Sequence, residues 1–210
     1  MKKLVLISGK MRSGKNAFAD IINDILKEKY TVTYDLFAKD LKDGVWEDFY
    51  SLHTFIYQQY WKLPKELREQ FSWMNVKKDD FYENKSVYGR LLLQIYGTEI
   101  FRNRVDDNWW VKQVFERWQK FFACVDVKDG AYVVTDVRFP NEIEYFSETL
   151  CPLVTVRVNR NNTENVINGE HFSEVALDDY SKFDYIIEND GTLEDLKKKA
   201  EEFCEKVFGK

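Results

Sequence analysis

A glycine-containing turn, GKMRSGKN at residues 9–16, separates two segments whose hydrophobic patterns differ. Before the turn, residues 4–7 are uninterrupted apolar side chains, as expected of a strand buried on both faces. After it, residues 15–27 place apolar side chains at helical spacing, namely Phe18, Ile21, Ile22, Ile25 and Leu26. The sequence therefore predicts a strand, a tight turn and a helix in immediate succession, which is a beginning typical of α/β proteins.

Four further apolar runs continue this arrangement along the chain. We expect strands at residues 31–35, 131–135, 153–158 and 185–187, with helices between most of them. A closing helix is predicted from about Thr192 to Phe208, because Asp195 follows Thr192 at the spacing of a capping box. Near-continuous apolar strands separated by helices indicate a parallel sheet covered on both faces. A chain of 210 residues suffices for one such domain.

The long segment between the second and third predicted strands has a different composition. Residues 46–122 hold all six tryptophans of the chain, at helical spacings and without a clear strand pattern. Core packing accounts for most aromatic side chains in such a pattern. We interpret this segment as a helical insertion.

The turn at residues 9–16 also matches the P-loop pattern G-x-x-x-x-G-K-[ST] at every position except the last. Gly9 and Gly14 permit the tight backbone turn that aims amide N–H groups at phosphate oxygens. The positive end of the following helix favours the same anion, and Lys15 places a charge between the β- and γ-phosphates. Asn16 replaces the Ser or Thr that would bind Mg²⁺, although an amide carbonyl also ligates this ion or holds one of its waters. These residue types predict a nucleotide phosphate site that uses Mg²⁺.

The third predicted strand ends in the sequence VVTDVRFPNE. Groups at the carboxyl ends of parallel strands face the ligand crevice. We therefore expect Asp136 to lie near Mg²⁺ and the phosphates, and Arg138 to point into the same crevice. The alternative is structural, since the two residues precede a helix begun by Pro140 and could form a cap or a salt bridge there.

The sequence RLLLQIYGTEIFRNRVDDNWW, residues 90–110, places polar side chains among apolar ones. Arg90 and Gln94 share a helix face at i, i+4 spacing. Arginine suits bidentate capture of phosphate, and glutamine suits the reading of a base edge. A solvated surface role explains any single arginine equally well. The hypothesis that this segment binds a second, phosphorylated substrate, the acceptor, therefore depends on the whole cluster. Its members are Arg90, Gln94, Glu99, Arg102 and Arg104, followed by Trp109 and Trp110.

Charge and composition argue against several classes of protein. A formal charge of -5 is unlike that of a nucleic-acid clamp. No stretch approaches the ~20 apolar residues of a membrane span, and the run at residues 4–7 is too short for a signal peptide. Three cysteines without metal spacing are typical of reduced thiols in the cytoplasm. Two histidines predict neither a catalytic triad nor a zinc site.

Several motifs together resemble those of bacteriophage deoxynucleoside monophosphate kinases. In chain order they are GKMRSGKN, YDLFAKDLK, GRLLLQIYGTEIFR, VVTDVRFPNE, EHFSE and IIENDGT, and residues 46–85 carry no matching motif. The loop alone is generic, whereas YGTEIFR, DVRFPNE and HFSE are more specific. The resemblance implies a P-loop NTPase with the three-layer parallel sheet of nucleoside monophosphate kinases, a helical substrate-binding insertion and a mobile lid. It further implies ATP, Mg²⁺, deoxynucleoside monophosphates as acceptors, frequent dimerisation and, for a phage protein, the host cytoplasm.

The resemblance also implies roles for individual residues. The catalytic residues would be Lys15, Arg12, Asp136 and Arg138, with Asn16 and Asp136 holding Mg²⁺ directly or through water. The ATP contacts would be Gly9, Lys10, Met11, Ser13, Gly14, Lys15, Asn16, Arg160, Asn189, Gly191 and Thr192. The acceptor contacts would be Lys10, Asp35, Phe37, Ala38, Lys42, Arg90, Gln94, Glu99, Arg102, Arg104, Trp109, Arg138, His171 and Glu174. Within a single domain, the core would comprise residues 1–45, 125–158 and 183–210, the insertion about 46–124 and the lid about 159–175.

Two alternative functions stay open at the level of sequence. Animal phosphomevalonate kinases resemble the chain in a GK loop, a strand-end D-x-R and a run like FDYIIEN at residues 183–189. The YGTEIFR segment and the aromatic insertion favour a planar base over that small acid as acceptor. A non-enzymatic, nucleotide-dependent binding module would need neither convergent arginines for a second anion nor a polar lid.

Overall fold

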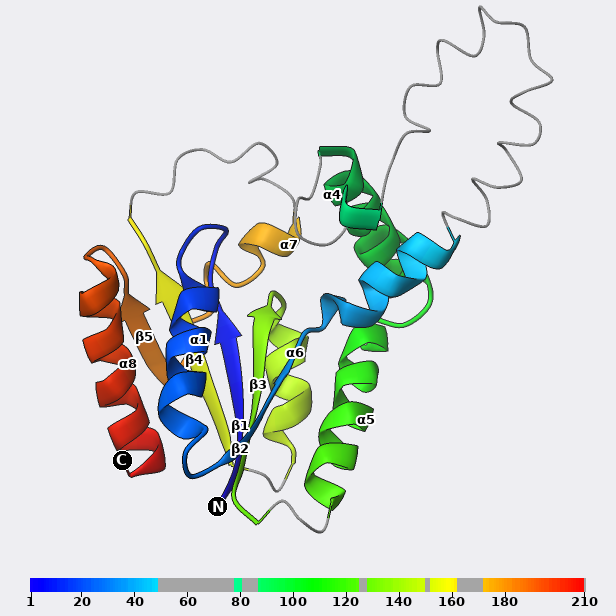
Figure 1. Cartoon of the computed structure of the whole chain (residues 1–210). Coiled ribbons are helices and arrows are strands. Elements are labelled where there is room, and N and C mark those ends of the chain that lie inside the picture. The colour runs from blue at the N-terminus through cyan, green and yellow to red at the C-terminus, as the bar shows by residue number, and fades with distance from the viewer. Residues whose placement is uncertain (49–77, 81–86, 125–127, 150–151, 162–171, 210) are drawn as a thin grey trace, which may run out of the picture. The chain divides into compact units, whose positions relative to one another are not determined.

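The computed structural model describes residues 1–48, 78–80, 87–124, 128–149, 152–161 and 172–209. Its strands are β1 (Lys2–Ser8), β2 (Thr31–Asp35), β3 (Gly130–Val137), β4 (Leu153–Asn159) and β5 (Tyr185–Glu188). They pair in parallel in the order β2-β3-β1-β4-β5 (Figure 1). The predicted parallel α/β sheet is confirmed, and every strand begins and ends within two residues of its predicted bounds.

Helices α1 (Lys15–Leu26) and α8 (Leu193–Phe208) cover one face of the sheet (Figure 1). Side chains of β1 that point to this face, Val5 and Ile7, are fully buried beneath them. The rings of Phe18 on α1 and Phe203 on α8 meet edge to face, with 5.6 Å between their centroids. The apolar stripe read from residues 15–27 therefore faces the sheet, as the helical period requires.

Helices α5 (Trp109–Ala123) and α6 (Pro140–Ser147) pack through aromatic side chains on the opposite face. Trp118 of α5 meets Phe146 of α6 at a centroid distance of 5.9 Å, and Phe121 lies 5.4 Å from Tyr132 of β3. Phe146 and Tyr132 are almost completely buried. Aromatic packing, the role expected for most rings in residues 46–122, is thus observed for these members.

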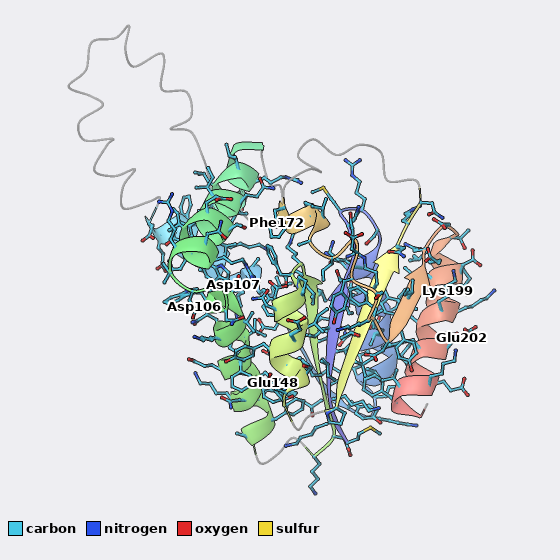
Figure 2. The ribbon with its side chains drawn as sticks, turned by 180° about the vertical axis from the view of Figure 1, so that it is seen from behind. Asp106, Asp107, Glu148, Phe172, Lys199 and Glu202 are labelled. Atoms are coloured by element: carbon cyan, nitrogen blue, oxygen red, sulfur yellow. The ribbon has the colours of Figure 1, made fainter. Side chains whose placement is uncertain are left out.

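The capping box predicted for the closing helix is confirmed. Thr192 is the N-cap of α8, its hydroxyl accepts a hydrogen bond from Asp195 N–H, and the Asp195 carboxylate accepts one from Thr192 N–H. Charged side chains on the outer surface of α8, among them Glu202, point away from the sheet (Figure 2). Within the described residues, no helix is long and apolar enough to cross a membrane.

The chain divides into two compact units, Met1–Phe37 with Val111–Lys210, and Ala38–Trp110. The first unit contains the sheet and also α7 (Phe172–Val175). The second contains a helix over residues 38–48, η2 (Lys78–Asp80), α4 (Val87–Gln94) and η3 (Ile95–Arg102). Val45 and Leu93 are its buried apolar centre. The predicted division into core, insertion and lid stays a prediction.

Candidate phosphate-binding site

The loop between β1 and α1 depends on its two glycines. A Cβ on Gly9 would lie 2.7 Å from the carbonyl oxygen of Val158, which is backbone and cannot move aside. Gly14 has a φ of 93°, in the left-handed region that favours glycine. A Cβ there would also lie 2.2 Å from Nδ2 of Asn189. The predicted need for glycine at both positions therefore has a direct steric cause.

Asn189 supports this loop from the end of β5. Its side chain is buried, and its Nδ2 donates a hydrogen bond of 2.8 Å to the carbonyl oxygen of Ser13. Its backbone N–H donates to Asn159 at the end of β4. Sequence predicted Asn189 as an ATP contact, and the structure gives this residue a contact with the loop backbone.

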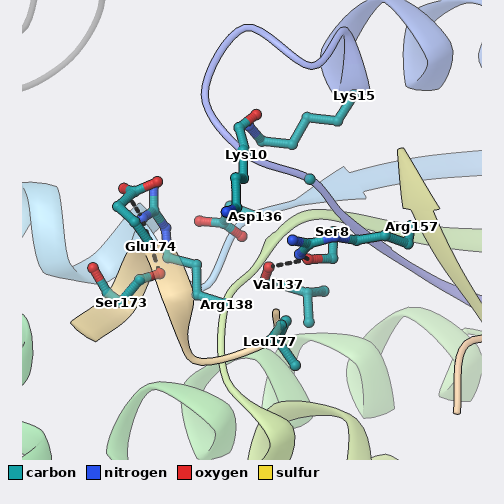
Figure 3. Close-up of a pocket in the computed structure, with 11 residues that line it drawn as sticks. Ser8, Lys10, Lys15, Asp136, Val137, Arg138, Arg157, Ser173, Glu174 and Leu177 are labelled. Atoms are coloured by element: carbon teal, nitrogen blue, oxygen red, sulfur yellow. Dashed lines mark hydrogen bonds and ion pairs between the residues drawn. The ribbon is translucent and has the colours of Figure 1, made fainter. Parts of the chain in front are cut away.

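Figure 3 shows a pocket at the carboxyl ends of β1, β3 and β4, where the loop begins. It is lined by Ser8, Gly9, Lys10, Lys15, Asp136, Val137, Arg138, Arg157, Ser173, Glu174 and Leu177. β1 lies between β3 and β4, so the strand order reverses here, and such switch points are the usual ligand sites of parallel sheets. The pocket thus brings together five predicted site residues of the core (Gly9, Lys10, Lys15, Asp136 and Arg138) and one from α7, Glu174.

Lys15 lies at this pocket in an environment that favours the loss of its proton. Burial lowers the pKa of the ammonium group below its ordinary value of 10.5, and the Arg138 guanidinium lowers it further. The carboxylates of Glu174 and Asp136 act in the opposite direction. A cation that is partly desolvated beside another cation is well placed to gain from a bound anion.

Arg138 and Asp136 are held by their own neighbours. Nη1 of Arg138 forms an ion pair with Glu174, and the backbone N–H of Arg138 donates to Glu142 at 2.7 Å. Glu142 also accepts from Phe139 N–H, the N-cap of α6, so the structural alternative for this turn is observed together with the pocket placement. Oδ1 of Asp136 accepts a hydrogen bond of 2.8 Å from the backbone of Phe37.

Asp35, predicted as an acceptor contact, is the centre of a buried network. Its Oδ2 accepts hydrogen bonds from Nε of Arg117 at 2.7 Å and from the hydroxyl of Tyr132. Arg117 also donates to the carbonyl oxygen of Leu36 at 3.2 Å. This network fixes the end of β2 immediately before Phe37, whose N–H bonds Asp136. Arg117 had no motif to mark it in sequence.

The remaining predicted residues of the nucleotide site lie on the loop, directly after β4 and near the end of β5; among them Arg12 was predicted as catalytic. Lys10, Arg12 and Asn16 are exposed, and Arg12 has a φ of 63°, which is unusual outside glycine. Met11 is half-buried, Ser13 is buried, and Gly191 and Thr192 are exposed at the start of α8. Arg160 follows β4 and is exposed, while His171, which was predicted as an acceptor contact, lies outside the described residues.

The acceptor contacts predicted on the second unit lie in several environments. Arg102 is buried. Its Nη1 donates to two oxygens of Asp107, the backbone carbonyl at 3.0 Å and Oδ1 at 3.3 Å. Asp107 is labelled in Figure 2. Glu99 is exposed and accepts from Asn103, whereas Arg104 is exposed. The half-buried members are Ala38, Lys42, Arg90, Gln94 and Trp109.

The YGTEIFR motif adopts a π-helix, η3, which continues directly from α4. Gly97 allows η3 to pack closely against Leu41, because a Cβ on Gly97 would lie 2.8 Å from Cδ2 of Leu41. Its carbonyl oxygen accepts a hydrogen bond of 3.0 Å from Nε1 of Trp110. π-helical turns are rare and frequently occur at functional sites, so the motif that most marked the resemblance also has an unusual backbone.

Five residues that line the pocket were not predicted as site residues, namely Ser8, Val137, Arg157, Ser173 and Leu177, and neither was Asp178, which contacts Lys10 and Arg157. Ser8 ends β1, and Arg157 lies near the carboxyl end of β4, between the buried side chains of Val156 and Val158. An arginine at the end of a parallel strand is a signal that could have been used, since such ends face the ligand crevice. Asp178 follows α7 in a polar stretch and gives no comparable signal.

Comparison with known proteins adds an independent observation. The family described as deoxynucleotide monophosphate kinase matches the chain over residues 53–200, which begins after the glycine-containing loop. A deoxynucleotide monophosphate kinase of Escherichia phage RB69 is 26% identical over 249 aligned residues, which cover 95% of this chain and 98% of that protein. The crystal structure of a gluconokinase from Sinorhizobium meliloti 1021 aligns with 99% of this chain and 96% of its own, at 10% identity and a TM-score of 0.40.

Proposed function

The chain belongs to the deoxynucleotide monophosphate kinase family, and from this premise we propose that it transfers the γ-phosphoryl group of ATP to a deoxynucleoside 5′-monophosphate. The products are ADP and a deoxynucleoside diphosphate. One observation supports this most directly: the pocket at the carboxyl ends of β1, β3 and β4 gathers Lys10, Lys15, Arg138 and Arg157 around the start of the glycine-containing loop. Cations gathered at a P-loop suit the charge that phosphoryl transfer spreads over the phosphate oxygens.

The loop itself fits a polyphosphate. Gly9 and Gly14 leave space where a Cβ would collide with the surrounding structure. The buried hydroxyl of Ser13 has no hydrogen-bond partner within the described part of the chain. Because buried hydroxyl groups are nearly always bonded, this atom supports a ligand at the loop. The backbone N–H groups of the loop and of the first turn of α1 would bind the phosphates, with Lys15 between the β- and γ-groups.

The protein does not need to remove a proton from the acceptor in this reaction. A phosphate oxygen of the acceptor, already ionised at neutral pH, forms the new bond to the γ-phosphorus while the bond to the β,γ-bridging oxygen breaks. The bridging oxygen leaves with its electron pair as part of ADP. No general base of high basicity is needed, so Lys15 and Arg138 contribute charge at the transferring group and Arg12 is proposed to assist them from the loop.

The donor groups of the pocket fit Mg²⁺, which prefers hard oxygen ligands. We propose that Asp136 holds the ion, with the amide oxygen of Asn16 ligating it directly or through water. When bound, Mg²⁺ would neutralise charge that develops on the β- and γ-phosphate oxygens. Phe37 N–H orients the Asp136 carboxylate, so the end of β2 supports this position.

For the acceptor, we propose that Arg90 and Gln94 bind phosphate and base, together with the other predicted contacts of the second unit and Asp35, Phe37, Arg138 and Glu174. Support comes from the family match, which covers the YGTEIFR and DVRFPNE motifs. Contacts from Arg160 and His171 of a lid, dimerisation and action in a host cytoplasm rest on the resemblance alone and stay proposals. The phosphomevalonate alternative receives no support from the family match.

A coupled assay of ADP formation tests this function. Wild-type protein and Lys15→Ala would be measured with ATP and Mg²⁺ against each deoxy- and ribonucleoside monophosphate and against phosphomevalonate. Turnover that requires a deoxynucleoside monophosphate and is lost in the variant is the expected result. Turnover with phosphomevalonate alone would replace the acceptor assignment, and ATP binding without any acceptor-dependent turnover would indicate a binding module.

A further inference from the structure

Two cations of the phosphate pocket share one carboxylate. Lys10 comes from the loop after β1, and Arg157 comes from the end of β4 (Figure 3). Nζ of Lys10 lies 2.6 Å from Oδ2 of Asp178, while Nη2 of Arg157 lies 3.1 Å from Oδ1 of the same residue. Asp178 follows α7 and is not among the residues that line the pocket. The Asp178 carboxylate therefore bridges two side chains from separate elements, and those two side chains line the pocket whereas Asp178 does not.

Arg157 is anchored on its other side as well. Its Nη1 donates a hydrogen bond of 2.8 Å to Oγ of Ser8, and Ser8 in turn donates to the carbonyl oxygen of Val137. Ser8 and Arg157 are register partners on the paired strands β1 and β4. The guanidinium group also lies over the ring of Phe183, 5.9 Å from its centroid. With only 12% of its side chain exposed, Arg157 is held in one orientation at the edge of the pocket.

The charge balance of this cluster favours an anion in the pocket. One carboxylate faces two cations, so a net positive charge remains on the group. Lys10 has a long, flexible side chain that loses rotamer entropy when it is ordered. Its bond to Asp178 restricts it before any phosphate arrives, and pre-ordering of this kind improves binding by reducing the entropy lost at that moment.

We propose that Asp178 is a positioning residue for the polyphosphate of the nucleotide donor, acting through Lys10 and Arg157. Arg157 and Lys10 contact the phosphates, and Asp178 holds both cations at one wall of the pocket without contacting substrate itself. The inference rests on the proposed kinase function and deepens it. In the opposite role, the carboxylate would compete with phosphate for the same cations. The two roles differ in the sign of their effect on nucleotide affinity.

The test compares Asp178→Asn with Asp179→Asn, which removes the same charge one residue away from an exposed side chain. For each variant, KM for ATP, KM for the acceptor and kcat would be measured, and ADP binding would be titrated by calorimetry. We expect Asp178→Asn to weaken ADP binding and raise KM for ATP roughly two- to fivefold, the range of one or two partly exposed ion pairs. KM for the acceptor should rise less than KM for ATP, because Lys10 is predicted to contact both substrates whereas Arg157 is proposed to contact the donor, and Asp179→Asn should match wild type throughout.

A double-mutant cycle separates positioning from general structural support. In a background that carries both Lys10→Met and Arg157→Gln, Asp178→Asn should have no further effect on KM for ATP or on ADP binding. A full effect in that background would overturn the proposal, and so would tighter ADP binding by Asp178→Asn, which would show competition. Asp178→Ser, a turn-compatible substitution, provides a second variant if thermal unfolding shows that Asp178→Asn is poorly folded. Because ADP binding does not require an acceptor, failure of the kinase assignment and failure of this inference give different results.

Discussion

The cations of the phosphate pocket and those of the Ala38–Trp110 unit reach their places by different means. Around the pocket, Lys10, Lys15, Arg138 and Arg157 come from the loop and from strand ends that a parallel sheet brings to one edge. In the second unit, Arg102 is buried and bonds Asp107, only five residues away in sequence. The ends of neighbouring parallel strands thus bring cations from distant parts of the chain to one pocket. In a helical segment, by contrast, a cation can form hydrogen bonds with residues of the same segment. Proximity of arginines in sequence is therefore weaker support for a site than convergence of strand ends.

The first prediction bears on the pocket and carries the largest expected effect. Lys15→Ala should lower kcat by at least about a hundredfold, because the lost charge acts at the transferring phosphoryl group. Thermal unfolding should confirm that the variant is folded. If the variant kept more than about a tenth of wild-type kcat, the loop would not be the phosphoryl-transfer site, and the contrast between the two regions would lose its basis.

The second prediction concerns Arg90, a cation of the Ala38–Trp110 unit that is proposed to bind the acceptor. Arg90 is half-buried on α4, and its loss should remove a charge-assisted contact with the acceptor, worth about 1.5–3 kcal/mol. Arg90→Ala should therefore raise KM for the monophosphate while KM for ATP stays near the wild-type value. Steady-state kinetics with each substrate varied in turn would measure both. An equal rise in the two values would show that the acceptor hypothesis for Arg90 is wrong.

Arg102 sharpens the comparison, because it donates hydrogen bonds to Asp107 within its own unit. Arg102→Ala should lower the free energy of unfolding by about 1.5–3 kcal/mol, as expected for loss of hydrogen bonds from a charged group. Arg104 is exposed two residues away, and Arg104→Ala should change stability by no more than about 0.5 kcal/mol. Chemical denaturation of both variants makes the measurement. A fully stable Arg102→Ala variant with a raised KM for the monophosphate would instead favour the predicted acceptor role.

The smallest expected effect comes from a site that belongs to neither set of cations. Thr192→Ala removes the N-cap of α8 and should lower stability by about 1 kcal/mol while leaving KM for the monophosphate unchanged. Hydrogen bonds from Thr192 hold the pKa of the Asp195 carboxyl below its ordinary value of 3.8. The ionised carboxylate therefore stabilises the fold at pH values above 3.8, and this stabilisation is lost as the pH falls through the lowered pKa. The stability difference between wild type and Thr192→Ala should therefore shrink in acid. A raised KM for ATP would support the predicted ATP contact of Thr192, whereas a raised KM for the monophosphate would mean that lost stability alone disturbs substrate binding.

Features that depend on neighbours along the chain were predictable from the sequence. The five strands were placed within two residues, and both halves of the Thr192–Asp195 capping box are observed. Gly9 and Gly14 were identified because the turn between a buried strand and a helix limits the residue types that fit. Asp136 and Arg138 followed from the rule that strand ends face the crevice, and both line the pocket.

Other features needed the tertiary structure. The π-helical backbone of YGTEIFR has no clear signature in residue order, and its tight contact with Leu41 comes from a separate helix. The network of Asp35, Arg117 and Tyr132 likewise joins residues that share no motif. Where polar side chains lie far apart in the chain, local propensity gives no information on their pairing, because the fold alone determines which of them meet.

By itself, the sequence determined a parallel α/β sheet, the position of the phosphate loop and the strand end that carries Asp136. Periodicity, glycine geometry and capping act over a few residues, so they can be read directly from residue order. Only the tertiary structure decided that Asn189 supports the loop at Ser13, 176 residues away, and that Arg157 meets Ser8 across 149 residues. Those contacts exist because parallel pairing of β1, β4 and β5 brings their carboxyl ends to one edge of the sheet, and that pairing is a property of the whole fold.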